Sequence, residues 1–408
     1  MKKAISLALA LSLTFVSLTA CGNAATESAD TTATESTDAA ATESTDAATT
    51  ESAGATFKIG GIGPATGGAA VYGLAVKNGA QLAVDEINAA GGINGAQIEF
   101  NFQDDEHDAE KAVNAYNTLK DWNMQILMGT VTSTPCIAVA EETNRDQIFQ
   151  LTPSGSAVPC VQYDNAFRVC FSDPNQGIAS AQYIGANKVA SKVAVIYDSS
   201  DVYSSGIYGK FAAESENQGI EIVAAEAFTA DSKTDFSVQL QKAKDAGAEL
   251  VFLPIYYTEA SLILSQASTM GFDTKFFGCD GLDGILSVEN FDTTLAEGLM
   301  LLTPFAADAQ DDLTKNFVAS FQTAYGEVPN QFAADAYDAI YIIKAAIETG
   351  KVSADMSAQD ICAALKPAMT TISIDGLTGA GMTWTADGEV NKAPKAVKIE
   401  NATYVAMQ

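Results

Sequence analysis

Serine, tyrosine and aspartate residues follow apolar stretches at several places, where they could bind a small dipolar molecule. Ser133 follows the apolar stretch 125–129, and Asp280 follows the apolar stretch 275–278. Hydroxyl groups and the free N–H groups at a helix N-terminus can bind a carboxylate without Lys or Arg. A carboxylate such as that of Asp280 can pair with an ammonium group. A site with both halves suits a zwitterion, and its apolar side chain could be surrounded by Tyr72, Tyr203 and Tyr256.

The composition argues against catalysis and against anionic partners. The 408-residue chain has a single histidine, His107, in the polar run 104–108, which predicts a solvated loop rather than a metal site. A Ser-His-Asp or Cys-His catalytic group would have to use that one residue, and no CxxC, HExxH or Walker-type sequence occurs. The net charge of −29 disfavours nucleic acid and anionic lipid headgroups, since both bind cationic patches. We therefore expect a binding protein, not an enzyme, with no metal, no cofactor and no nucleic-acid partner.

Strand-like stretches alternate with helical patterns through much of the chain. Short apolar stretches predict strands at 56–62, 97–102, 125–129, 192–197, 221–223, 250–254 and 275–278. Helical patterns between them predict helices at 76–87, 107–122, 204–218, 234–246 and 258–270. Such alternation is typical of parallel sheets covered by helices on both faces. In these sheets ligands bind at the carboxyl ends of the strands, which is where Ser133, Tyr203 and Asp280 are expected.

The length of the chain predicts two lobes. Residues 56–408 number 353, which is more than one hydrophobic core usually supports. Two separate series of alternating strands and helices fit this size. The sequence therefore predicts an α/β fold with two doubly wound, Rossmann-like lobes.

The beginning of the chain predicts export and attachment to a membrane. Lys2 and Lys3 precede the uncharged apolar run 4–18, which is shorter than the ~20 residues of a membrane-spanning helix. The run ends in small residues before Cys21, a pattern that resembles a bacterial lipobox. We expect 1–21 to be a lipoprotein signal peptide, with Cys21 as the lipidated residue. A plain signal peptide with an incidental cysteine is the alternative.

The next segment, 22–55, predicts a disordered acidic linker of mostly Ala, Thr, Glu and Ser. One octapeptide occurs at 33–40 and again at 41–48, and the segment has seven acidic residues but no Lys, Arg or aromatic residue. Such a segment cannot bury enough apolar surface to offset the entropy lost on ordering. We expect it to hold the folded region away from the outer face of the membrane.

Five cysteines remain when Cys21 carries a lipid, and an extracellular setting permits a disulfide between two of them. Cys136 and Cys160 are the favoured pair. A bond between Cys160 and Cys170 is one alternative, and five small, buried, free cysteines are another.

Short stretches spread over some 350 residues occur in an order that carries a family resemblance. They are 63–73, 79–95, 132–133, 152–156, 167–168, 173–177, 203–206, 235–236, 256–257 and 278–281. In these stretches the chain resembles type I periplasmic binding proteins, specifically the leucine/isoleucine/valine-binding group of ABC transporters. The lipobox and linker fit a lipid-anchored member of this family.

The resemblance implies a role for each site residue. The hydroxyl groups of Ser133 and Ser156, with nearby backbone N–H groups, would bind the α-carboxylate of an amino acid. Asp280 and a carbonyl group of Ser154 or Gly155 would bind its α-ammonium group. The cleft would be lined by Tyr72, Tyr203 and Tyr256. Relatives often have Thr in place of Ser156 and either Asp or Glu in place of Asp280, which leaves the preferred side chain open.

The resemblance also implies how the lobes are built. Lobe 1 would comprise 56–173 and 305–393, and lobe 2 would comprise 174–304 and 394–408. The chain would cross between the lobes in a three-crossing hinge near 173–177, 302–305 and 393–397. Ligand would lie between the lobes and stabilise their closed arrangement.

The function implied is the capture of an amino acid, branched-chain or otherwise aliphatic, on the extracellular or periplasmic side of the membrane. The protein would deliver it to the permease and ATPase subunits of an ABC importer. One alternative is a ligand-sensing receptor of the same fold for an amide or another small polar ligand. An enzyme on the same scaffold is a third possibility, which the single histidine disfavours.

Overall fold

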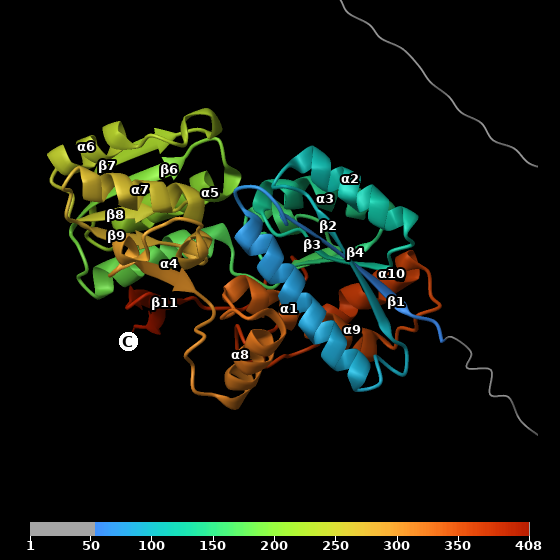
Figure 1. Ribbon diagram of the computed structural model, residues 1–408. Coiled ribbons are helices and arrows are strands. Elements are labelled where there is room, and N and C mark those ends of the chain that lie inside the picture. The colour runs from blue at the N-terminus through green and yellow to red at the C-terminus, as the bar shows by residue number, and fades with distance from the viewer. Residues whose placement is uncertain (1–53, 408) are drawn as a thin grey trace, which may run out of the picture. The chain divides into compact units, whose positions relative to one another are not determined.

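The computed structural model describes residues 54–407. The expected signal peptide, the lipidation site Cys21 and nearly all of the expected linker lie outside these residues. Within them the chain forms two parallel-dominated sheets with helices on both faces (Figure 1), which confirms the predicted α/β class. No helix among residues 54–407 is both long enough and apolar enough to span a membrane.

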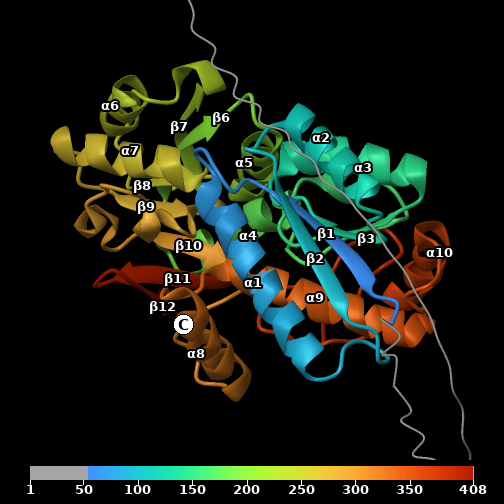
Figure 2. The same ribbon diagram turned by 45° about the vertical axis from the view of Figure 1, so that its right-hand side comes forward.

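The first sheet has five parallel strands in the order β2-β1-β3-β4-β5. These strands are β1 (Phe57–Gly63), β2 (Ile98–Asp104), β3 (Ile126–Gly129), β4 (Phe149–Thr152) and β5 (Ala166–Arg168). One face packs on α2 (Ala109–Asp121) and α3 (Ser133–Asp146). The other face packs on α1 (Ala70–Ala89), α9 (Gln331–Gly350) and α10 (Ala358–Met369), as Figure 2 shows.

The second sheet has seven strands in the order β12-β11-β10-β9-β8-β6-β7. They are β6 (Lys192–Asp198), β7 (Glu221–Phe228), β8 (Leu250–Leu253), β9 (Lys275–Gly278), β10 (Met300–Thr303), β11 (Lys395–Glu400) and β12 (Thr403–Ala406). All neighbours are parallel except β11, which runs antiparallel to both β10 and β12.

Alternate residues of β6 explain why helices cover both faces of the second sheet. Val193 and Val195 pack with α4 (Asp173–Ala186) and α5 (Val202–Ser215) on one face. Ala194 and Ile196 point to the opposite face, toward α6 (Ser237–Asp245) and α7 (Tyr257–Thr269). Because side chains alternate along a strand, a fully apolar run is buried on both sides.

The chain passes between the sheets three times: between β5 and α4, between β10 and α8 (Asp312–Tyr325), and before β11. We call the elements around the first sheet lobe 1, which includes α8, and those around the second sheet lobe 2. The structure thus has the three-crossing arrangement predicted for the fold. Asp173, the last residue of the expected lobe 1, begins α4; this helix packs with α5 of lobe 2, while the Asp173 N–H donates to the Ser156 carbonyl of lobe 1 at 3.0 Å.

The expected disulfide is wrong in this structure, because all five described cysteines are free, buried thiols: Cys136, Cys160, Cys170, Cys279 and Cys362. Cys136 and Cys160 do pack together with Ala157 in a small apolar cluster. The Cys160 thiol donates a hydrogen bond to the carbonyl of Ser133, and the Cys136 sulfur accepts one from Gln150. Both sulfur atoms are therefore satisfied without a covalent bond, as in the third alternative.

Candidate functional site

A small cavity lies between the carboxyl ends of the two sets of strands, and we call it the cleft. Its walls are formed by Tyr72, Val131, Thr132, Ser133, Ser154, Ser156, Tyr203, Tyr256, Asp280, Gly281 and Phe332. The structure therefore brings together every predicted ligand-binding residue except Gly155. The cavity volume is about 10 Å³, enough for about one water molecule, so the two walls are in contact.

In lobe 1 the first wall is the N-terminus of α3. The chain leaves β3 at Gly129 and enters the 14-residue helix at Ser133, which is 2% exposed. The Ser133 hydroxyl accepts a hydrogen bond from the backbone N–H of Ala157 at 3.1 Å, which leaves its own proton available to a ligand. Free N–H groups and the helix dipole make this end of α3 favourable for an anion.

The second wall of lobe 1 is the loop 153–158 after β4. The Ser154 hydroxyl donates to the carbonyl of Val131 at 2.7 Å, so this serine joins the loop to the α3 wall. Ser156 is 1% exposed, and its hydroxyl lies against Asp173. Gly155 lies behind them: its N–H donates to the Thr152 hydroxyl at 2.7 Å and its carbonyl accepts from Arg168 at 3.3 Å.

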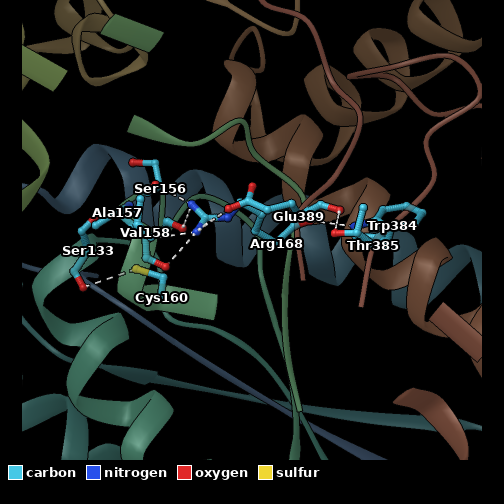
Figure 3. A network of polar contacts seen from close by, with 10 residues as sticks. Ser133, Ser156, Ala157, Val158, Cys160, Arg168, Trp384, Thr385 and Glu389 are labelled. Atoms are coloured by element: carbon cyan, nitrogen blue, oxygen red, sulfur yellow. Dashed lines mark hydrogen bonds and ion pairs between the residues drawn. The ribbon is translucent and has the colours of Figure 1, made fainter. Parts of the chain in front are cut away.

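The Arg168 side chain lies between this loop and Glu389, as Figure 3 shows. Its guanidinium group is fully buried and donates to the carbonyls of Ser156, Ala157 and Val158 as well as Gly155. It also forms an ion pair with Glu389 at 3.4 Å. With its carbonyls turned toward the guanidinium group, the loop directs Ser154 and Ser156 to the cleft.

Lobe 2 contributes an acid between stacked aromatic rings. The rings of Tyr203 and Tyr256 stack with centroids 4.9 Å apart and an angle of 9° between their planes. The Tyr203 hydroxyl donates to Asp280 Oδ1 at 2.7 Å and accepts from the N–H of Gly281 at 2.9 Å. The Asp280 N–H donates to Gln176 at 3.1 Å, which fixes the backbone that carries this carboxyl group.

Burial dominates the electrostatics of Asp280. The residue is 3% exposed, and desolvation raises the pKa of its carboxyl to about 7 despite hydrogen bonds from Tyr203 and Gln176 that lower it. No Lys or Arg lines the cleft among the described residues. An ammonium group beside Asp280 would supply the missing positive charge and favour the ionised carboxylate.

Tyr72 joins the lobes across the cleft. It lies near the start of α1 in lobe 1, yet its hydroxyl donates to the carbonyl of Gly281 and accepts from the N–H of Tyr257 at 3.2 Å in lobe 2. The Tyr257 hydroxyl in turn accepts from the N–H of Val71 at 3.1 Å. These hydrogen bonds hold the lobes in a closed arrangement.

Several residues at the site had no predicted role. Asp173 is fully buried at the start of α4, and burial raises the pKa of its carboxyl well above the usual range. Its place in the stretch 173–177 was the only available signal. Thr132 and Phe332 line the cleft, but no local pattern in the sequence distinguishes them from core residues.

His107 lies in the predicted loop, in the turn between β2 and α2, but its side chain is half-buried rather than solvated. Its Nδ1 lies 2.8 Å from the hydroxyl of Thr132, and its ring meets the Tyr256 ring edge to face at 5.4 Å. Burial lowers the pKa of His107, so the neutral ring is favoured. The polar run 104–108 turns this side chain toward the cleft, which the charges around it did not indicate.

Comparisons with known proteins agree with this fold. The family model described as "Periplasmic binding protein" matches residues 56–403. The leucine-, isoleucine-, valine-, threonine- and alanine-binding protein of Pseudomonas aeruginosa is 30% identical over 298 residues, 72% of this chain and 79% of that protein. Leu/Ile/Val-binding protein homolog 3 of Brucella melitensis is 31% identical over 306 residues, 74% of this chain and 82% of that protein.

Two solved structures have the same fold. Leucine-binding protein LivK from Thermotoga maritima superposes with a TM-score of 0.77 and 25% identity, covering 86% of this chain and 98% of that one. The branched-chain amino acid transporter substrate-binding protein LivJ from Streptococcus pneumoniae, in complex with isoleucine, has a TM-score of 0.77 and 29% identity. It covers 86% of this chain and 100% of its own.

Proposed function

The chain belongs to the periplasmic binding protein family, and from this premise we propose that it binds an aliphatic amino acid in the cleft and delivers it to an ABC importer. The observation that carries the proposal is the polarity of the cleft. Hydroxyl groups and the free N–H groups at the start of α3 lie on lobe 1, and the buried acid Asp280 lies on lobe 2. A zwitterion between them would contact both lobes.

Each end of the ligand then has a defined partner. The α-carboxylate would take hydrogen bonds from the hydroxyl groups of Ser133 and Ser156 and from nearby N–H groups. The α-ammonium group would pair with Asp280, with the carbonyl of Ser154 as a further acceptor. Its aliphatic side chain would pack against Tyr72, Tyr203 and Tyr256. Gly155 would act through the loop rather than by contact, because its carbonyl already accepts from Arg168.

Binding requires the lobes to separate and close again. The walls of the cleft touch, and Tyr72 bonds directly to lobe 2. Entry of an amino acid would break such contacts, and ligand contacts to both lobes would then restore closure. The three chain crossings give the lobes a common hinge for this motion.

We further propose that the protein works on the extracellular or periplasmic side, attached through Cys21 and the linker 22–55. Its partners would be the permease and ATPase subunits of the importer. We propose a binding role without catalysis, because capture and release of a ligand need no chemical step. The single histidine, His107, bonds to Thr132 and lies against an aromatic ring.

A thermal-shift screen of the wild-type protein against the twenty amino acids tests the proposal. Ligands that bind only the folded protein raise its melting temperature. We expect leucine, isoleucine or valine to give the largest shifts, and the Asp280→Asn protein to lose them. Wild-type shifts with amides but with no amino acid would instead favour a sensor of the same fold. Turnover of any of these compounds would support an enzyme.

A further inference from the structure

The starts of α1 and α7 face each other across the boundary between the lobes, as Figure 2 shows. The first N–H groups of a helix have no partner within it, and a Ser, Thr, Asp or Asn at the N-cap commonly accepts from one of them. The N-caps here are Ala69 for α1 and Tyr256 for α7, and in the described chain neither side chain caps its helix. The N–H groups that begin both helices therefore need acceptors from other segments.

Each of the two helices is capped by a tyrosine of the other. The N–H of Val71, in the first turn of α1, donates to the Tyr257 hydroxyl at 3.1 Å. The N–H of Tyr257, the first residue of α7, donates to the Tyr72 hydroxyl at 3.2 Å. The two tyrosine rings meet edge to face with centroids 4.7 Å apart. We call this pair of hydrogen bonds the reciprocal cap, and both of its bonds exist only while the lobes are closed.

A separate hydrogen bond joins the lobes at the start of α9. The N–H of Gln331, the first residue of this lobe 1 helix, donates to Asp283 Oδ2 in lobe 2 at 2.8 Å. This bond shares no residue with the reciprocal cap, so its N–H reports opening of the lobes independently. Tyr257 is 4% exposed and is not among the described residues that line the cleft. Its hydroxyl therefore favours closure without contact to a ligand.

We propose that Tyr257 is a positioning residue for the cleft: through the reciprocal cap it holds Tyr72 in place and keeps the lobes closed. Opening of the lobes breaks both bonds of the cap, so a protein without the Tyr257 hydroxyl opens more often. For a bound ligand, which rests on the proposed function, this means faster dissociation. Association changes little, because it begins with separated lobes in which the cap is already broken.

The first test is hydrogen exchange of the ligand-free protein, resolved to single amides. Tyr257→Phe removes one hydroxyl and keeps the aromatic ring and the backbone N–H of the cap. In this variant the amides of Val71 and Gln331 are expected to exchange about fivefold faster than in wild type, the effect of one lost hydrogen bond on opening. Tyr208→Phe is the matched control, since Tyr208 packs within lobe 2, and it should exchange like wild type at both amides.

The second test is stopped-flow kinetics with leucine. Dissociation from Tyr257→Phe should be about fivefold faster, and association should stay within about twofold of wild type. Unchanged exchange at Val71 would overturn the reciprocal cap. Faster exchange at Val71 with Gln331 unchanged would make Tyr257 a local helix cap and overturn its role in closure, and leucine release at the wild-type rate would overturn its role for the cleft. If the wild-type protein bound no leucine, the proposed function would fail, but the exchange of the ligand-free protein would still decide whether Tyr257 keeps the lobes closed.

Discussion

Two cavities lie between the same two lobes but differ in size and chemistry: the cleft, and a larger groove lined by residues that include Val71, Leu74, Leu286, Phe321 and Tyr404. The cleft is about 10 Å³ and is lined by hydroxyl groups, aromatic rings and one acid, whereas the groove is about 640 Å³ and largely apolar. The cleft is built from residues at strand ends and helix N-termini. The groove is built from the sides of α1 and α8 and, for the larger part, from loops and strand ends, and only Asp283 among the described residues gives it a buried charge.

The two cavities therefore respond differently to closure of the lobes. In the cleft, polar groups meet directly across the gap, and a ligand must replace those contacts. In the groove, the lobes leave a cavity although they are closed, so a ligand could enter without breaking the Tyr72 hydrogen bonds. Affinity in the cleft should therefore depend on a few polar atoms.

Removal of the cleft acid should have the largest effect. In the Asp280→Ala protein the buried ammonium group of an amino acid would have no counter-charge. Breaking a buried ion pair from one side costs roughly 3–5 kcal/mol. We expect calorimetry to show loss of most leucine or valine affinity.

The matched variant is Asp283→Asn, three residues further along and in the groove. Its leucine affinity should stay within about threefold of wild type, since the group lines the other cavity. Equal losses in the two variants would mean that the cavities are not chemically separate. Unchanged leucine or valine binding by Asp280→Ala would refute the proposed role of this acid.

Removal of the guanidinium group behind the cleft should affect both stability and binding. In Arg168→Met the carbonyls of Ser156 and Ala157 lose a buried donor, and each unsatisfied buried group costs roughly 1–3 kcal/mol. We expect urea unfolding to show this loss and calorimetry to show weaker leucine binding, because the loop 153–158 is no longer held.

Lys366→Met provides the comparison, since Lys366 pairs with the largely exposed Asp164 at 2.9 Å. Exposed ion pairs contribute about 0–1 kcal/mol. An Arg168→Met protein as stable as Lys366→Met would show that the loop does not depend on the guanidinium group.

Acid pH should weaken binding in the cleft. Burial raises the pKa of Asp280 to about 7, and only the ionised carboxylate can pair with an ammonium group. As the pH falls below 7, binding must release a proton, so affinity should decrease toward tenfold per pH unit, or about 1.4 kcal/mol. Leucine affinity measured from pH 5 to 8.5 should rise up to about pH 7 and then level off.

The stability of the ligand-free protein should change with pH in the opposite direction. With its pKa raised above the unfolded value of about 3.9, Asp280 holds a proton in the folded state that the unfolded chain releases between about pH 4 and 7. Its contribution to the free energy of unfolding therefore falls as the pH rises through that window. If the Asp280→Asn protein showed the same pH dependence of leucine affinity and of unfolding free energy as wild type, both would have to arise from other carboxyl groups.

The sequence predicted the part of the site that follows strands. The strand predicted at 125–129 is β3 (Ile126–Gly129), and the start of α3 directly after it holds Ser133. The prediction worked because a doubly wound sheet brings all strand ends to one edge, whatever their separation in the chain. Tyr203 and Asp280 meet at 2.7 Å for the same reason.

The parts that escaped prediction depend on contacts between distant segments. Phe332 lies on α9, a largely buried helix in which apolar residues predominate, so no pattern singles it out. Arg168 was noted only as part of a short stretch, and its function depends on the loop folding over it. The groove had no signal at all, because its walls come from helices, loops and strand ends of both lobes, which meet only when both lobes have formed.

The smallest predicted effect concerns residues at the edges of the two cavities. His107 bonds to Thr132 at 2.8 Å and lies against the Tyr256 ring, so His107→Ala removes one hydrogen bond and one aromatic contact beside the cleft. Each is worth roughly 0.5–1.5 kcal/mol, and because both contacts lie at the edge we expect leucine affinity to fall about threefold. Leu74→Lys changes the edge of the groove and should leave leucine affinity unchanged. Calorimetry measures the leucine affinity of both variants. If Leu74→Lys weakened leucine binding more than His107→Ala did, the two cavities would not be independent.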